Sequence, residues 1–114
     1  MHLRATFAAL FLSLPAFAQD LATGDAITAA IADKTVQGSM VDSGAYTEFY
    51  AADGTIRGDG YTGTWSVEGD QMCFNYGEGA SCWSVRLNGD SVTWMKDGKE
   101  DGTGTLIAGN PNNF

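Results

Sequence analysis

Residues 65–94 read WSVEGDQMCFNYGEGASCWSVRLNGDSVTW, and apolar and polar residues alternate there between turn-forming pairs. Alternation that is interrupted by turn residues about every eight to twelve positions is typical of an antiparallel β meander. The expected two-residue turns are Gly69-Asp70, Gly77-Glu78 and Asn88-Gly89. Counting outward from the first turn pairs Trp65 with Phe74. Counting outward from the last turn pairs Trp83 with Trp94, and Val85 with Val92.

The three turns together predict one continuous apolar face. Its members are Trp65, Val67, Met72, Phe74, Tyr76, Trp83, Val85, Leu87, Val92 and Trp94. The opposite face is polar and includes Ser66, Glu68 and Cys73. A slip of one residue would turn every tryptophan toward water, so the hydrophobic pattern strongly specifies the register. We therefore expect the tryptophans on the dry side of a sheet and Cys73 on the wet side.

A further turn at Asp53-Gly54 extends the meander toward the N-terminus. It sets Ala51 opposite Ile56 and leaves Glu48, Tyr50 and Arg57 on the polar face. An exposed pair such as Glu48 and Arg57 is usually a surface salt bridge of small energetic value.

A tight turn at Gly60-Tyr61 would set Gly58 opposite Gly63, and facing glycines suggest a sharp bend, as in a closing barrel. Outer strands are expected near residues 35–41 and 102–107. The predicted fold is all-β: an antiparallel meander of about eight strands that forms a small barrel or a strongly bent sheet.

One short N-terminal helix is expected over residues 25–33, which read DAITAAIAD. Thr23 or Asp25 could cap it, and Ile27 and Ile31 share one face. Such a helix could plug or cover an open end of the sheet. The tail from residue 109 to residue 113 is expected to be turn-like or disordered.

Cys73 and Cys82 face one another in the predicted hairpin, at a pair without mutual backbone hydrogen bonds. Such pairs bring the two chains close enough for a cross-strand disulfide. A redox-active pair would require a C-x-x-C motif and a neighbouring base, and the sequence has neither. We therefore predict a structural disulfide.

The first eighteen residues have the pattern of a signal peptide. A positive start at residues 1–4 precedes an apolar run at residues 5–14 and the small-x-small triplet at residues 16–18. The run is too short for a membrane span, which needs about 20 apolar residues. Cleavage is expected between Ala18 and Gln19. The product would be one β domain of residues 19–114, periplasmic or secreted, without a lipid or membrane anchor.

The mature chain would be strongly acidic. Loss of Arg4 leaves five basic residues against fourteen acidic ones, a net charge of −9. Nucleic acid and anionic membranes both require cationic surface, so neither is an expected partner. Loss of His2 also removes the one histidine, which excludes serine-histidine and cysteine-histidine catalysis and histidine metal sites.

The sequence offers no convincing metal or catalytic site. Residues 97–102 begin like a calcium loop, but Lys99 occupies a ligand position and Ala108 replaces the closing glutamate. No pair of carboxylates falls on the apolar face, so acid-base catalysis lacks a candidate. We expect a monomer that is not an enzyme and that uses no metal or other cofactor.

Five aromatic residues are the candidate ligand site. They are Trp65, Phe74, Tyr76, Trp83 and Trp94. Eight-stranded barrels can hold one small ligand, so these side chains could line a cavity. Large aromatic side chains also fill barrels simply by packing, and this alternative stays open at the level of sequence.

Turns, tryptophans and cysteines also carry a resemblance. The pattern consists of Tyr46…Tyr50-x-x-Asp53-Gly54-Thr55, Gly63-Thr64-Trp65, Asp70-x-x-Cys73, Cys82, Trp94 and Gly109-Asn110-Pro111. It resembles a group of small uncharacterised exported proteins of Gram-negative bacteria, which implies a compact periplasmic β domain and no assigned activity. A weaker likeness is to periplasmic lysozyme inhibitors with a Ser-Gly-Ala-basic-Tyr motif; residues 43–46 lack its basic residue.

Two functions follow as hypotheses. The first is a non-enzymatic binding or structural domain whose partner is an unknown small ligand or protein. The alternative is a periplasmic inhibitor of a hydrolase, a protease or a lysozyme, with residues 77–79 or 110–114 as the protrusion that enters the target.

Overall fold

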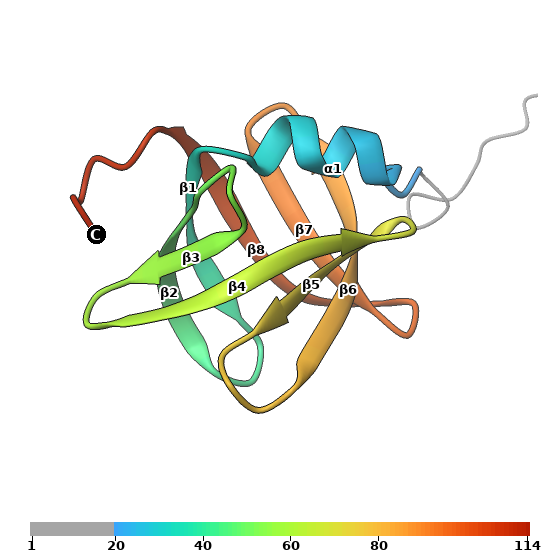
Figure 1. Cartoon of the computed structure of the whole chain (residues 1–114). Coiled ribbons are helices and arrows are strands. Elements are labelled where there is room, and N and C mark those ends of the chain that lie inside the picture. Colours follow the sequence, from blue (N-terminus) through green and yellow to red (C-terminus); the bar gives the residue numbers. More distant parts are fainter. Residues whose placement is uncertain (1–19) are drawn as a thin grey trace, which may run out of the picture.

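A computed structural model describes residues 20–114, which form a closed barrel of eight antiparallel strands and one helix (Figure 1). The elements are α1 (Gly24–Ile31), β1 (Lys34–Met40), β2 (Gly44–Tyr50), β3 (Thr55–Gly58), β4 (Tyr61–Glu68), β5 (Gln71–Asn75), β6 (Ala80–Asn88), β7 (Ser91–Lys96) and β8 (Lys99–Ala108). The predicted signal peptide and the cleavage site at Ala18 and Gln19 lie outside the described residues.

The first and last strands pair with each other and close the barrel. Seven residue pairs join β1 to β8, from Lys34 opposite Ala108 to Met40 opposite Gly102. All the remaining pairings, from β1–β2 to β7–β8, join strands that are consecutive in the sequence. The predicted all-β meander of about eight strands is therefore confirmed. The sequence left open a small barrel or a strongly bent sheet, and the structure has the closed barrel.

The central hairpins have the predicted register. Trp65 lies opposite Phe74, and Met72 lies opposite Trp83. Trp65, Phe74 and Trp94 are buried in the core, as the apolar face predicts.

The predicted turn between β6 and β7 is displaced by one position. The two residues between the strands are Gly89 and Asp90, so Val85 pairs with Trp94 and not with Val92. Gly89 has φ +59°, which suits the first central residue of a type II′ turn. The pairing shifts by two residues, and a shift of two keeps every side chain on its predicted face.

The predicted register between β2 and β3 is wrong by one residue, and this error reverses a face. Tyr50, not Ala51, lies opposite Ile56. The Gly54 amide donates to the Ala51 carbonyl (2.9 Å) and the Ala51 amide donates to the Thr55 carbonyl (2.8 Å). Gly54, with φ +95°, is the extra residue of a three-residue bulged loop. The slip directs Glu48 and Tyr50 into the barrel, where both are buried.

The predicted pairing of Gly58 with Gly63 is also wrong, because the turn between β3 and β4 lies at residues 59–60. Gly58 pairs with Tyr61, and Gly63 pairs with Ile56. The glycines that face one another are instead Gly38 and Gly104, on the two strands that close the barrel.

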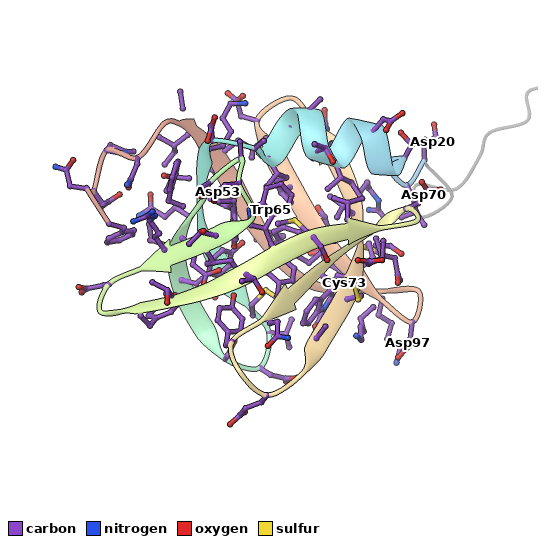
Figure 2. The ribbon with its side chains drawn as sticks, in the orientation of Figure 1. Asp20, Asp53, Trp65, Asp70, Cys73 and Asp97 are labelled. Carbon is purple, nitrogen blue, oxygen red and sulfur yellow. A yellow bond between two sulfur atoms is a disulfide. The ribbon has the colours of Figure 1, made fainter. Side chains whose placement is uncertain are left out.

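Helix α1 covers one end of the barrel (Figure 1). The Thr23 hydroxyl accepts a hydrogen bond from the Ala26 amide and caps the helix, so of the two predicted caps, Thr23 and Asp25, the first is the one observed. Ile27 and Ile31 are fully buried. The Asp70 carboxylate accepts from the Gly24 amide (2.7 Å), so the β4–β5 turn holds the start of the helix (Figure 2).

The C-terminal tail forms a turn, which is one of its two predicted alternatives. The Asn110 side chain bonds to both the amide and the carbonyl of Phe114. The Gly109 carbonyl accepts from the hydroxyl of Thr35, a buried side chain on the outer face of β1 (2.7 Å). The tail therefore starts at the end of the barrel that α1 covers.

Cys73 and Cys82 form the predicted disulfide between β5 and β6, with their Cα atoms 4.0 Å apart (Figure 2). Cys73 lies on the outer face, as predicted, because it alternates with the core residues Met72 and Phe74, yet only 3% of it is exposed. No helix among residues 20–114 is both long enough and apolar enough to span a membrane.

Replacing both cysteines by alanine is expected to lower the free energy of unfolding by about 2.7 kcal/mol, because the bridge closes a loop of ten residues and restricts the unfolded chain. Urea unfolding of the oxidised protein and of the C73A/C82A variant, followed by tryptophan fluorescence, measures the difference. A loss below about 1 kcal/mol would contradict a structural role for the bridge.

Candidate ligand-binding cavity

The end of the barrel opposite α1 is hollow. A cavity of about 560 Å³ opens there among the β1–β2, β3–β4 and β5–β6 connections. Its rim includes Ser43, Ala45, Tyr61, Glu78, Gly79 and Ser81. Its walls are formed by Tyr46, Glu48, Tyr50, Phe74, Trp83 and Trp94.

A buried carboxylate stands in the wall of this cavity. Glu48 points inward from the middle of β2, and only 6% of it is exposed. Its Oε1 atom accepts hydrogen bonds from the hydroxyls of Tyr50 (2.7 Å) and Tyr76 (2.8 Å). Its Oε2 atom accepts from the hydroxyls of Tyr61 (2.6 Å) and Tyr76 (3.0 Å). Among residues 20–114, these four contacts with hydroxyl groups satisfy the carboxylate, and no basic side chain takes part.

The three tyrosines come from different hairpins. Tyr50 lies two residues from Glu48 on β2, Tyr61 starts β4, and Tyr76 belongs to the loop between β5 and β6. The rings of Tyr61 and Tyr76 meet edge to face, with centroids 6.1 Å apart. Glu48 therefore ties three separate segments of the chain together at the open end of the barrel.

Burial and the Glu48 charge keep these phenols protonated. Burial is the largest cause that raises the pKa of Tyr50, Tyr61 and Tyr76, and the Glu48 carboxylate raises each pKa further. A phenolate beside this carboxylate would place two negative charges within hydrogen-bonding distance. At neutral pH the tyrosines thus donate and Glu48 accepts.

Tyr46, two residues from Glu48 on the same face of β2, forms a second polar chain. Its hydroxyl accepts from Trp94 Nε1 (2.8 Å) and donates to the Thr103 carbonyl (2.9 Å). Burial raises the pKa of Tyr46 to about 12. Gly104 makes room for this hydroxyl, because a Cβ atom at position 104 would lie 2.5 Å from the Tyr46 oxygen.

An aromatic cluster completes the wall. The Phe74 ring lies edge-on to Trp83 and Trp94, with centroids 5.5 Å and 5.4 Å away. Trp83 Nε1 donates to the Asp101 carboxylate (2.9 Å), so this indole is held in place. The cavity is therefore mainly apolar on one side and carries a negative charge on the other.

Four of the five aromatic residues singled out from the sequence line the cavity: Phe74, Tyr76, Trp83 and Trp94. Trp65 does not. Its Nε1 atom donates to the Ala51 carbonyl (2.8 Å), and its ring packs against Tyr50 in the filled half of the barrel (Figure 2). Packing and cavity lining were alternatives at the level of sequence, and the barrel uses its aromatic residues for both.

The sequence interpretation missed the polar half of the site. It placed Glu48 and Tyr50 on the polar face near Arg57, whereas Arg57 is exposed and pairs with Phe49 on the outside. The same error of register placed the carboxylate of Glu48 outside, whereas the structure buries it in the interior. The alternation Tyr46-x-Glu48-x-Tyr50 was the available signal, because these three residues must share one face of a strand.

Residues 20–114 contain no group of three or more acidic, cysteine or histidine side chains placed to hold a metal ion. The stretch that resembles the start of a calcium loop is a hairpin turn. Lys96 pairs with Lys99, which leaves Asp97 and Gly98 as the two turn residues.

The two protrusions considered for hydrolase inhibition lie at opposite ends of the molecule. Gly79 lines the open cavity, whereas the tail begins beside Asp33 at the end that α1 covers. They do not form one continuous surface.

Comparison of the chain with protein-family models, with curated proteins and with solved structures finds no match. The resemblance to exported Gram-negative proteins and to lysozyme inhibitors therefore stays a prediction.

The tyrosines should titrate late as a group. All four have raised pKa values in the folded state, so native protein should form little phenolate until the pH passes well above the ordinary tyrosine value of about 10. Unfolding frees these protons. The four protonated tyrosines therefore stabilise the folded state fully below pH 10, and this stabilisation is lost as the pH rises above 10. Ultraviolet difference spectra of native and urea-unfolded protein test this. Coincident titration curves would contradict the buried cluster.

Gly104→Ala should lower the free energy of unfolding by about 1–3 kcal/mol, because the added methyl group would lie 2.5 Å from both the Tyr46 hydroxyl and Val36 Cγ1 and displaces that hydroxyl from Trp94. The indole N–H resonance of Trp94 should shift in nuclear magnetic resonance spectra. Thr105→Ala, an exposed neighbour on β8, is the control and should cost below about 0.5 kcal/mol. Equal effects of the two variants would contradict the packing argument.

Proposed function

We propose that this protein is a non-enzymatic domain that binds a small molecule in the open end of its barrel. The observation that carries the proposal is the cavity of about 560 Å³. Ligand pockets in proteins are typically about 300–1,000 Å³, mainly apolar, with a few polar groups that orient the ligand. The aromatic cluster and the Glu48 carboxylate supply these two elements.

The cavity is preformed by interactions within the chain. Glu48 holds Tyr76 in the β5–β6 loop, and the Cys73–Cys82 bridge joins the strands that carry this loop. Tyr46, on the same strand as Glu48, fixes Trp94. A site that is ordered before binding loses less conformational entropy when the ligand enters, and this supports a binding role.

The chemistry of the lining supports binding over catalysis. Both oxygens of Glu48 already accept hydrogen bonds, and the raised pKa values of its tyrosine partners make them weak acids at neutral pH. Ser43 and Ser81 also line the cavity, but residues 20–114 contain no histidine that could activate them. Both cysteines are paired.

Export to the periplasm or beyond is part of the proposal. The disulfide supports it, since such bridges persist mainly in oxidising compartments. The N-terminal signal pattern supports it independently.

Binding can be tested with the neutral aromatic probe N-phenyl-1-naphthylamine. Its fluorescence should rise when it enters the cavity of the wild-type protein. Ser81→Trp places a large ring at the rim and should abolish the rise. Ser66→Trp, on the exposed outer face of β4, is the matched control and should bind as the wild type does.

A rise in fluorescence that survives in Ser81→Trp would place the probe elsewhere and contradict the cavity as the site. Absence of any rise with the wild type would count against small-molecule binding itself.

A further inference from the structure

We propose that the ligand is an organic cation, an aliphatic ammonium group joined to an apolar body, with its charged nitrogen beside the tyrosine hydroxyls that surround Glu48. This inference rests on the proposed function and adds the chemical class of the ligand.

The lining of the cavity has one sign of charge. Of the residues that the structure describes, Glu48 and Glu78 belong to it, and no lysine or arginine does. The hydrogen-bond donors to Glu48 are neutral phenols, so within the described part of the chain its charge is solvated by dipoles and not neutralised by a cation. A charge buried in this way attracts an opposite charge far more strongly than one in water. A cation that enters the cavity gains this attraction, and an anion is repelled.

The tyrosines leave acceptors, not donors, for the ligand. A phenol has one proton, and Tyr61 and Tyr76 each give theirs to Glu48. The lone pairs of the two phenol oxygens remain, and donation to a carboxylate makes them stronger acceptors. An ammonium group, which only donates, fits such a site. A carboxylate or phosphate ligand would find no free donor on these two hydroxyls.

Aromatic rings stand where the cation would enter. Tyr61 and Tyr76 are 43% and 50% exposed, and both line the cavity near its mouth. Ring faces attract alkylammonium groups, most strongly where water is partly excluded. Deeper in the cavity, Phe74, Trp83 and Trp94 offer an apolar surface for the remainder of the ligand.

A lysine near these rings does not occupy the site. The ammonium group of Lys96 lies 4.5 Å from the centroid of the Trp83 ring and donates to the Cys82 carbonyl. Lys96 is exposed and does not line the cavity. Its place over Trp83 shows that the aromatic cluster already accepts a cation at one position.

The test compares three soluble probes of similar size at pH 7: 2-phenylethylamine, which is cationic; 2-phenylethanol, which is neutral; and 3-phenylpropionate, which is anionic. Binding is measured by titration in two-dimensional nuclear magnetic resonance spectra. The indole signals of Trp83 and Trp94 should move, and that of Trp65, which lies outside the cavity, should stay. The amine should bind at least about tenfold more tightly than the alcohol, and the propionate most weakly.

Glu48→Gln should reduce the ratio of amine affinity to alcohol affinity to about one, because it removes the charge and keeps the shape. Glu68→Gln is the matched control. Glu68 is exposed on the outer face of β4 and bonds only to Ser66 among the described residues, so this variant should keep the wild-type ratio. The two variants change the net charge equally.

Equal binding of amine and alcohol by the wild type would overturn the inference and leave the proposed function intact, since a neutral ligand would still occupy the cavity. The comparison of amine and alcohol uses only the wild-type protein, so it tests the inference even if Glu48→Gln does not fold. A preference for the amine that persists in Glu48→Gln would also overturn it. Failure of all three probes would overturn it too, and the naphthylamine experiment then decides whether small-molecule binding itself survives.

Discussion

The Glu48 carboxylate and the three tyrosine hydroxyls that bond to it organise the open half of this barrel. An isolated carboxylate is costly to bury, and here hydrogen bonds of 2.6–3.0 Å offset that cost. The donors come from β2, from the start of β4 and from the β5–β6 loop, so the same bonds that solvate the charge also fix the positions of three hairpins. The position of Tyr76 in particular depends on this carboxylate, because its loop extends beyond the paired residues of β5 and β6.

The two ends of the barrel differ because different side chains fill them. Beneath α1 the interior is closed by aliphatic residues, among them Ile27, Ile31 and Ile56, together with Trp65. At the other end polar hydroxyls and a carboxylate replace aliphatic side chains, and their hydrogen bonds join β2 to β4, to the β5–β6 loop and to β7. Glycines on β8 help to shape this half, since Gly102 and Gly104 leave space for Met40 and Tyr46. A cavity results where the sheet is closed but its interior is not packed.

The sequence predicted most of the fold and only part of the site. The hairpin from Gln71 to Asn88 was predicted pair by pair, because its turn and its alternating pattern agree on a single register. The turn after Asn88 was misplaced, yet the tryptophans stayed on the correct face because the resulting shift was two residues. The bulged loop at Ala51–Gly54 had the opposite effect. One extra residue there reversed the faces of β2, so the carboxylate that defines the cavity was assigned to the surface.

The sequence by itself determined the strands, their order and the disulfide, because hydrophobic alternation and turn residues act over a few positions and are visible in the chain. Only the tertiary structure decided that the sheet closes through β1 and β8, since nothing local specifies a pairing between residues some seventy positions apart. It also decided that Glu48, Tyr61 and Tyr76 meet. Their contact depends on the curvature of the closed barrel and on one additional loop residue, and both are properties of the assembled chain.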